Sequence, residues 1–200
     1  SQRRFGAVAG VVGGRLVVAG GYCDGVGLTS AEAYTGTGWT PLPPMPHYVC
    51  MATACVLNGR LYVIGGAASN ELQVLEMTEE NGLSWSCKAD LPAERYRAGS
   101  IVHEGKIVVM GGMVNGEATA SVVVYDPEED AWATAAPLPD PNASSVYLHP
   151  QLNSNGEILK NNADAGFARL DRHTRQWVQA DAGNRNDHTP SGEPGALLLG

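Results

Sequence analysis

The sequence predicts an all-β fold, a β-propeller of four-stranded antiparallel blades with about four repeats present. One basic residue, four apolar residues and two glycines recur as RLVVAGG, RLYVIGG and KIVVMGG. The glycine pairs begin at residues 20, 65 and 111, so the period is 45 and then 46 residues, which is typical of propellers and solenoids. All four tryptophans keep nearly the same period, at Trp39, Trp85, Trp132 and Trp177.

The strand inside the repeated motif is apolar at every position. A half-exposed strand would alternate apolar and polar residues, so this strand is expected to be covered on both faces. Blades that stand side by side, each between two neighbours, provide that cover. We therefore expect one propeller domain over residues 1–200, with repeats at about 3–45, 46–91, 92–138 and 139–183, and with 184–200 as the start of a further repeat or a closing segment.

The third repeat illustrates the strands expected in each blade. Its strands are predicted at 97–103, 106–110 and 121–125, with a short fourth strand beginning at Trp132. Glu104-Gly105 and Asp126-Pro127 supply the turns, and a loop, MVNGEATA, follows the glycine pair. The glycines are expected where the backbone needs positive φ and close packing, so a β-branched residue at Gly66 should be more damaging than loss of a surface glycine.

These features resemble the kelch repeat, in which a strand ending in Gly-Gly is followed by a tyrosine and a tryptophan. The residues that match this signature are Gly20, Gly21, Tyr34 and Trp39, then Gly65, Gly66 and Trp85, then Gly111, Gly112, Tyr125 and Trp132, and finally Trp177. Leu75 and Leu170 stand near the tyrosine position of the second and fourth repeats, and Asn162-Ala163 replace the fourth glycine pair. The tyrosines and tryptophans of this signature are expected to pack between blades.

Kelch propellers resemble rings of five to seven blades, more than the four repeats found. The resemblance therefore implies an incomplete ring or fragment that further chain or a partner copy completes. A ring of four blades closed on itself is the alternative, with the degenerate fourth repeat as an adapted terminal blade.

Composition narrows the classes of partner and compartment. The net charge of −8 argues against nucleic acid as a partner. The sequence contains no run of about 18 apolar residues, the length that a membrane-spanning helix needs. The four cysteines lack the spacing of a zinc site and are expected to be reduced thiols, as in a cytoplasmic protein. No cofactor or metal is expected.

The resemblance to kelch adaptor proteins implies that arginines just before the first strand engage acidic peptides. Arg4 and Arg95 are the candidates, with Arg97 two residues on, because guanidinium groups suit carboxylates. The alternative is an arginine paired within the propeller. Loops after the glycine pairs add Tyr22, Asn70 and Asn115 as candidates for partner binding.

We therefore expect a non-catalytic protein–protein interaction module, a substrate-recognition or scaffold part of a larger protein, with an acidic peptide segment or another protein as partner. The alternative is a propeller oxidase or small-molecule enzyme with copper at the blade junctions. His47-Tyr48, Tyr147 and His149 stand at equivalent junctions and belong to residue types that bind copper.

Overall fold

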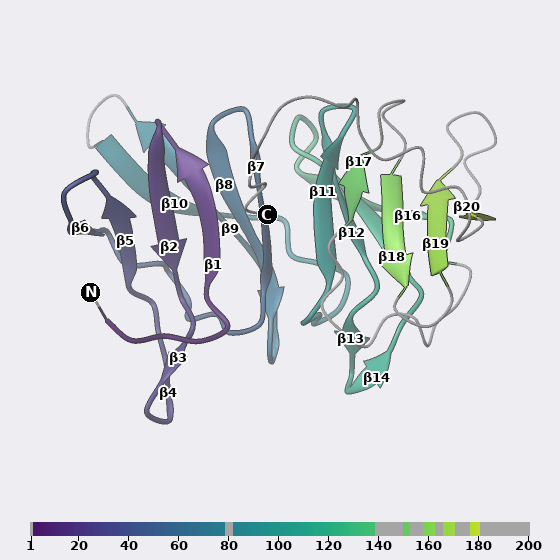
Figure 1. Ribbon diagram of the computed structural model, residues 1–200, viewed down its shortest axis with the longest axis horizontal. Coiled ribbons are helices and arrows are strands. Elements are labelled where there is room, and N and C mark those ends of the chain that lie inside the picture. The colour runs from purple at the N-terminus through teal and green to yellow at the C-terminus, as the bar shows by residue number, and fades with distance from the viewer. Residues whose placement is uncertain are drawn as a thin grey trace.

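The computed structural model describes residues 2–78, 82–138, 150–152, 158–162, 166–170 and 177–180, and it contains four four-stranded antiparallel sheets side by side (Figure 1). Blade 1 consists of β1 (Val8–Val12), β2 (Arg15–Ala19), β5 (Ala31–Tyr34) and β6 (Trp39–Leu42). Blade 2 consists of β7 (Thr53–Leu57), β8 (Arg60–Gly66), β9 (Ser69–Thr78) and β10 (Gly82–Lys88). Blade 3 consists of β11 (Gly99–His103), β12 (Lys106–Met110), β15 (Val122–Asp126) and β16 (Ala131–Ala135). Blade 4 consists of β17 (Gln151–Leu152), β18 (Ile158–Asn162), β19 (Gly166–Leu170) and β20 (Trp177–Ala180).

The predicted fold class is confirmed, and each strand pairs with the next one along the chain of its own blade. Two features were not predicted: the loops after the first and third glycine pairs form small hairpins, β3 (Tyr22–Cys23) with β4 (Val26–Gly27), and β13 (Met113–Val114) with β14 (Glu117–Ala118). The predicted start of a further repeat at 184–200 lies outside the described residues. In the part of the chain that the structure describes, no helix is long and apolar enough to span a membrane.

Each blade carries one row of cross-strand partners that ends at its tryptophan, called here the tryptophan row. The rows, from first strand to fourth, are Val11–Leu16–Tyr34–Trp39 in blade 1, Val56–Leu61–Leu75–Trp85 in blade 2, and Val102–Ile107–Tyr125–Trp132 in blade 3. Leu75 therefore occupies the tyrosine position, as the sequence indicates. In blade 4 the backbone of Leu170 likewise stands opposite that of Trp177.

The core lies between blades, where a tryptophan row packs against the preceding blade. Leu61 and Leu75 are fully buried against apolar side chains of blade 1, among them Val12 and Val17. One blade further on, Ile107 and Tyr125 are buried against blade 2. This arrangement explains the wholly apolar second strand of blade 2, because one face of β8 meets blade 1 and the other meets blade 3.

Indole hydrogen bonds and the first strands strengthen the contact between neighbouring blades. Trp85 Nε1 donates to the carbonyl oxygen of Pro43 in the segment after blade 1 (2.9 Å), and Trp132 Nε1 donates to that of Ala89 after blade 2 (2.7 Å). The first strand of blade 2, β7, contacts both β1 and β11. The hydroxyls of Thr53 on β7 and Ser100 on β11 lie 2.7 Å apart.

Asp130 adds a further tie between blades 2 and 3. Its Oδ1 accepts the backbone N–H of Ala89 (2.9 Å) and the hydroxyl of Tyr125 (2.6 Å). These two hydrogen bonds, led by the one from Ala89, hold the pKa of Asp130 below its usual value. Burial, and then the bond to Asp130, raise the pKa of Tyr125, so the tyrosine stays a neutral donor.

Blade 1 departs from the prediction that the tyrosines and tryptophans of the repeat signature pack between blades. Tyr34 and Trp39 are 41% and 38% exposed, whereas Tyr125 is 1% exposed. The reason is positional: blade 1 packs against blade 2 through its other face, and its tryptophan row looks away from the neighbouring blade.

Candidate functional site: the hairpin face

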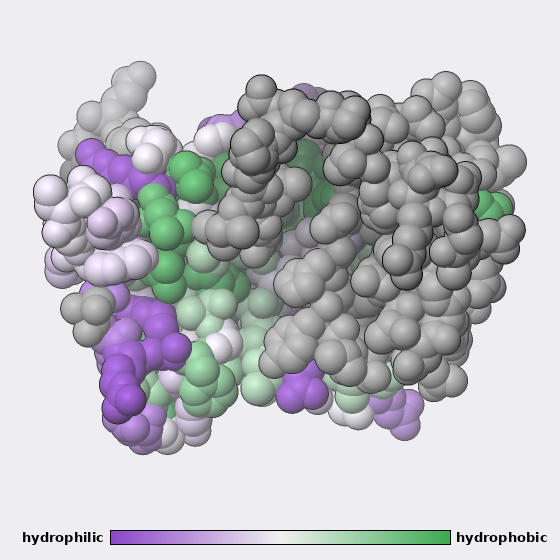
Figure 2. All heavy atoms as spheres, viewed as in Figure 1, coloured by the Kyte–Doolittle hydropathy of each residue, from purple (hydrophilic) through white to green (hydrophobic). Residues whose placement is uncertain are grey.

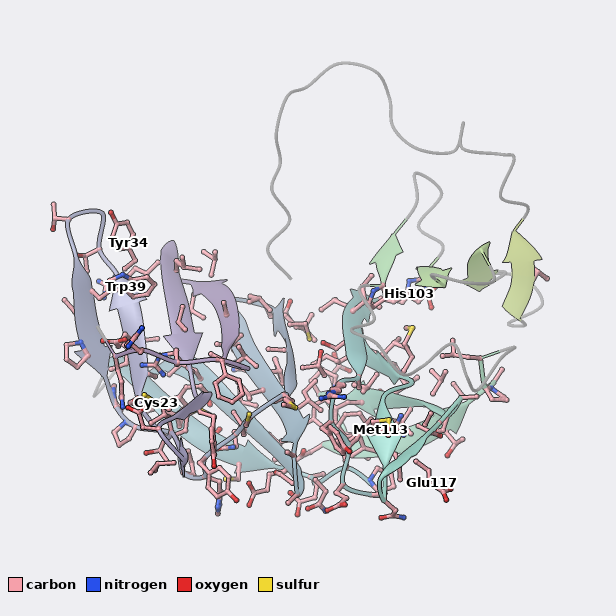
Figure 3. The ribbon with its side chains drawn as sticks, turned by 60° about the horizontal axis from the view of Figure 1, so that its bottom comes forward. Cys23, Tyr34, Trp39, His103, Met113 and Glu117 are labelled. Atoms are coloured by element: carbon pink, nitrogen blue, oxygen red, sulfur yellow. The ribbon has the colours of Figure 1, made fainter. Side chains whose placement is uncertain are left out.

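The hairpins β3–β4 and β13–β14 project from the same end of the blades (Figures 1 and 3). Each follows a glycine pair and is held by the segment that leads into its own blade, through the bridges Phe5–Tyr22 and Tyr96–Met113. We call this end of the blades the hairpin face. It consists of the two hairpins, the segments 4–6, 48–52 and 95–98, and the turn 67–69. Blade 2 has only the tight turn there, because Gly66 already pairs with Ser69. Two projecting hairpins therefore flank a lower middle blade.

Arg4 and Arg95 lie at the bases of these hairpins rather than on their surface. Arg95 is 5% exposed, and its Nη1 donates to the carbonyl oxygens of Gly111 (2.7 Å) and Ser121 (3.2 Å), while Nη2 donates to Ser121 Oγ (2.6 Å). These oxygens stand where the chain enters and leaves the β13–β14 hairpin. Burial lowers the pKa of Arg95, the direction expected for a desolvated cation.

Arg4 makes the same contacts in blade 1. Its Nη1 donates to the carbonyl oxygens of Gly20 (2.7 Å) and Ser30 (2.9 Å), and its Nη2 pairs with Glu32 (3.0 Å). The side chain of Arg4 is 7% exposed. The terminal nitrogens of both arginines therefore bond within the propeller, as the alternative interpretation expects, and a partner contact for Arg4 and Arg95 stays a prediction.

Blade 2 supports this structural role because it lacks both the hairpin and the arginine. Val49 stands at the arginine position, and Glu71 replaces the serine that faces Arg4 and Arg95 in the other two blades. Glu71 instead lies 3.1 Å from Nδ1 of His47. The arginine and serine thus accompany the long hairpin and disappear with it.

The three candidate residues from the loops differ in their surroundings. Tyr22 lies on β3 and makes an edge-on contact with the ring of Phe5, with ring centroids 5.4 Å apart. Asn115 lies exposed at the tip of β13–β14 with φ of 52°, a conformation that asparagine tolerates better than most residues. Asn70 is bound to Leu91, since its Nδ2 donates to the Leu91 carbonyl oxygen (3.2 Å). This bond ties its side chain to the segment after blade 2, and a partner contact at Asn70 stays a prediction.

Arg97 is the predicted arginine that the propeller does not occupy. Among the described residues its guanidinium has no hydrogen-bond or ion-pair partner; its Nε is buried, and its Cζ lies 5.9 Å from the centre of the Tyr96 ring. The backbone N–H of Arg97 donates to Met51, whose own N–H donates to Gly6, at 2.9 and 3.0 Å. All three residues have left-handed backbone, with φ from 55° to 62°. They form one row across the segments that lead into the first strands of blades 1 to 3.

An exposed apolar patch on the same face was missed by the sequence reading. Phe5, Val26 and Tyr48 are 57%, 61% and 53% exposed, and Tyr22 joins them through its contact with Phe5. A Cβ on Gly27 would collide with the ring of Tyr48, so that ring lies directly on the β4 backbone. We call Phe5, Tyr22, Val26 and Tyr48 the aromatic patch. The only signal in the sequence was the aromatic residue that follows Arg4, Arg95 and His47.

The copper alternative rests on residues that the structure describes only in part. Tyr147 and His149 lie outside the described residues. Nδ1 of His47 faces Glu71, and Tyr48 belongs to the aromatic patch. Within the described segments no group of three histidine, cysteine, aspartate or glutamate residues is placed to hold a metal ion.

Comparisons with known proteins agree with this geometry. The Kelch motif model matches residues 94–139, which is the third blade. Human Kelch-like protein 35 is 36% identical over 150 residues, covering 72% of this chain and 24% of that protein. Human Kelch-like protein 23 is 31% identical over 141 residues, covering 68% of this chain and 24% of that protein. The chain thus spans about a quarter of the length of these relatives.

A solved structure shows the same fold. The structure of YjhT superposes with a TM-score of 0.67 at 13% sequence identity, covering 88% of this chain and 68% of that chain. The blades, their glycine pairs and tryptophans, and the Kelch motif and Kelch-like matches lead to the same conclusion: the chain belongs to the kelch-repeat family.

Proposed function

We propose that this propeller is a protein-interaction module whose hairpin face binds a segment of another protein, in the manner of a substrate adaptor. An apolar side chain of the partner segment lies on the aromatic patch, and a carboxylate pairs with Arg97. The observation that carries this proposal is the coincidence of three strongly exposed apolar side chains with an unoccupied guanidinium on one face.

The energetics of recognition favour these residue types. Aromatic residues and arginine contribute most of the binding energy in protein interfaces. Aromatic side chains bury a large area and lose little side-chain entropy, and arginine offers carboxylates a planar fork of donors. A scaffold tied down by Arg4, Arg95 and the glycine pairs presents the patch without further ordering, so little binding energy is lost on conformational change. The net charge of −8 favours a protein partner over nucleic acid, and an acidic segment then needs a local cation such as Arg97.

The proposed module works by binding, without covalent chemistry. Its described thiols are poor nucleophiles; burial raises the pKa of Cys55 to about 12, which leaves almost no thiolate near neutral pH. The matches to proteins named Kelch-like support a kelch interaction module. The kind of segment that it would bind is inferred from the residues of the hairpin face.

Random peptides displayed on phage and selected on the purified chain provide the test. We expect selected peptides to combine an acidic residue with an aromatic or large aliphatic residue. Their affinity, measured by fluorescence polarisation, should fall about tenfold or more in Arg97→Glu and in Tyr48→Ala. Raising the salt concentration should weaken binding to the wild-type chain.

Arg60→Glu is the matched control, because Arg60 lies at the start of β8, at the other end of the blade from the glycine pair, and is half exposed. It should leave peptide affinity unchanged. Equal losses in Arg60→Glu and Arg97→Glu would refute a localised site, and selected peptides that bind Tyr48→Ala as well as wild type would remove the aromatic patch from the interface.

A further inference from the structure

Tyr48 is the member of the aromatic patch that comes from the segment entering blade 2. Its ring lies against Gly27 of β4, where an added Cβ would be 2.8 Å from Tyr48 Cγ and 2.9 Å from Cε2. Tyr22 is the cross-strand partner of Gly27, so the rings of Tyr22 and Tyr48 stand on the same face of the β3–β4 hairpin. Figure 2 shows apolar atoms next to strongly hydrophilic ones at the end of blade 1 from which this hairpin projects. Because the Tyr48 ring is 53% exposed, its position depends on how the backbone of Tyr48 is held.

The residues on either side of Tyr48 are both bound to the propeller. After it, Val49 is 1% exposed, and its carbonyl oxygen accepts a backbone N–H of blade 1 at 2.7 Å. Before it, the backbone N–H of His47 donates to Oε1 of Gln73 on β9 (2.9 Å). The Nδ1 of His47 lies 3.1 Å from Oε1 of Glu71, which is on the same strand. Two side chains of β9 therefore fix the residue that precedes Tyr48.

A glutamine is an unfavourable residue for the place that Gln73 occupies. Its side chain is fully buried, and its Nε2 has no hydrogen-bond partner among the described residues. A buried amide donor without a partner destabilises a fold. At the same register in blade 3 stands Val123, which is apolar and 5% exposed. What glutamine supplies and valine cannot is Oε1, the acceptor for the backbone N–H of His47.

Blade 2 lacks the arginine that holds the entering segment in blades 1 and 3. In blade 1 that arginine is Arg4, and Glu32, which stands at the register of Gln73, pairs with it at 3.0 Å. In blade 2, Gln73 has no arginine to bind and instead accepts the backbone N–H of the entering segment directly. The position thus serves the same end in both blades, because it fixes the segment that leads into the first strand.

We propose that Gln73 and Glu71 are positioning residues of the partner site: they hold His47, and through it they keep the Tyr48 ring on the β4 backbone. The inference rests on the proposed binding at the hairpin face and adds to it Gln73, which is too deeply buried to touch a partner. Gln73 has the larger effect, because His47 and Glu71 are 51% and 27% exposed and water weakens their pair. A ring that is already in place loses less side-chain entropy when the partner segment binds.

The α-proton signals of Gly27 report the position of the Tyr48 ring without any peptide. In NMR spectra of the 200-residue chain they should be displaced from their positions in Tyr48→Ala, because an aromatic ring shifts the signals of protons that lie against it. Gln73→Met removes the acceptor but keeps an unbranched, buried side chain, and it should lose most of this displacement. Its urea midpoint should stay at or above that of the wild type, since the unpartnered Nε2 is removed as well.

The affinity of Gln73→Met for a phage-selected peptide, measured by fluorescence polarisation, should fall about threefold to tenfold, which corresponds to ordering one side chain on binding. In the Tyr48→Ala background the same substitution should change the affinity no further, because Gln73 acts through Tyr48. Leu72→Met is the matched control, since Leu72 is the neighbour of Gln73 on β9 and is fully buried but faces blade 3. It should leave the Gly27 signals and the affinity unchanged.

Wild-type Gly27 signals in Gln73→Met would overturn the proposal, because the ring would then keep its place without the acceptor. So would a loss of affinity that Gln73→Met repeats in the Tyr48→Ala background, or that Leu72→Met reproduces, because the effect would then not pass through Tyr48. Gly27 signals that lose their displacement in Gln73→Met, in a chain for which no binding peptide can be selected, would support the positioning role while refuting the proposed function.

Discussion

Replacing Arg95 with methionine is expected to lower the free energy of unfolding by about 3 kcal/mol. Methionine keeps much of the apolar stem but removes a cation that donates to the carbonyl oxygens of Gly111 and Ser121 and to the Ser121 hydroxyl. The buried Gly111 carbonyl oxygen is left without this charged donor, whereas the Ser121 carbonyl oxygen keeps only the Gly111 N–H and the Ser121 hydroxyl keeps only that of Thr119. Urea unfolding followed by tryptophan fluorescence measures the change.

Arg60→Met is the matched control for Arg95→Met. Arg60 Nε pairs with Glu76 Oε2 at 2.8 Å, but the Arg60 side chain is 50% exposed, so water compensates for most of the lost pair. A loss of about 0.5 kcal/mol is expected. If the two variants lost the same stability, Arg95 would not be the clamp that its contacts indicate, and a partner contact for it would need to be reconsidered.

Gly112→Ala is expected to lower the free energy of unfolding by about 4 kcal/mol, or to prevent folding. An added Cβ would lie 2.6 Å from the Tyr96 carbonyl oxygen and 2.8 Å from the Ala98 nitrogen. Both atoms are backbone in the segment that leads into β11, so they cannot rotate away as a side chain would. The residue also has φ of +83°, which adds strain for any residue with a Cβ.

Gly116→Ala separates the steric effect from the backbone effect. Gly116 has almost the same φ, +80°, but its Cβ would meet nothing within 4 Å. It should lose only about 1 kcal/mol, the cost of left-handed backbone for alanine. Thermal unfolding of both variants by circular dichroism measures the difference. Similar losses would show that the crowding of the glycine pair contributes little.

The blades were predictable because the information that specifies them recurs along the chain. The period of the glycine pairs and tryptophans gives the number of units, and the wholly apolar second strand gives their side-by-side packing. Even the substituted position was readable: Leu75 pairs with Trp85 just as Tyr125 pairs with Trp132. The small hairpins were missed because each uses only two residues per strand.

The candidate site was less predictable because its members come from different repeats. The position of Arg95 before a first strand says nothing of the carbonyl oxygens of Gly111 and Ser121 that surround it. Phe5, Val26 and Tyr48 lie far apart in sequence and come together only around the β3–β4 hairpin, where Tyr22 bridges to Phe5 and the Tyr48 ring lies on Gly27. The greater exposure of Trp39 could not be predicted, because its position in the repeat is the same as that of the partly buried Trp132.

The side-by-side arrangement of the blades can be checked with a disulfide between their first strands. The variant Thr53→Cys with Ser100→Cys replaces two hydroxyls 2.7 Å apart on β7 and β11. Cys55→Ala is included because Cys55 lies two residues from Thr53 on the same face of β7, where its thiol would compete for the disulfide. We expect an intramolecular disulfide on mild oxidation, seen by mass spectrometry as the loss of two hydrogens from the intact folded chain. A folded variant that keeps both thiols free would show that β7 and β11 are not neighbours, and the radial arrangement of blades 2 and 3 would be wrong.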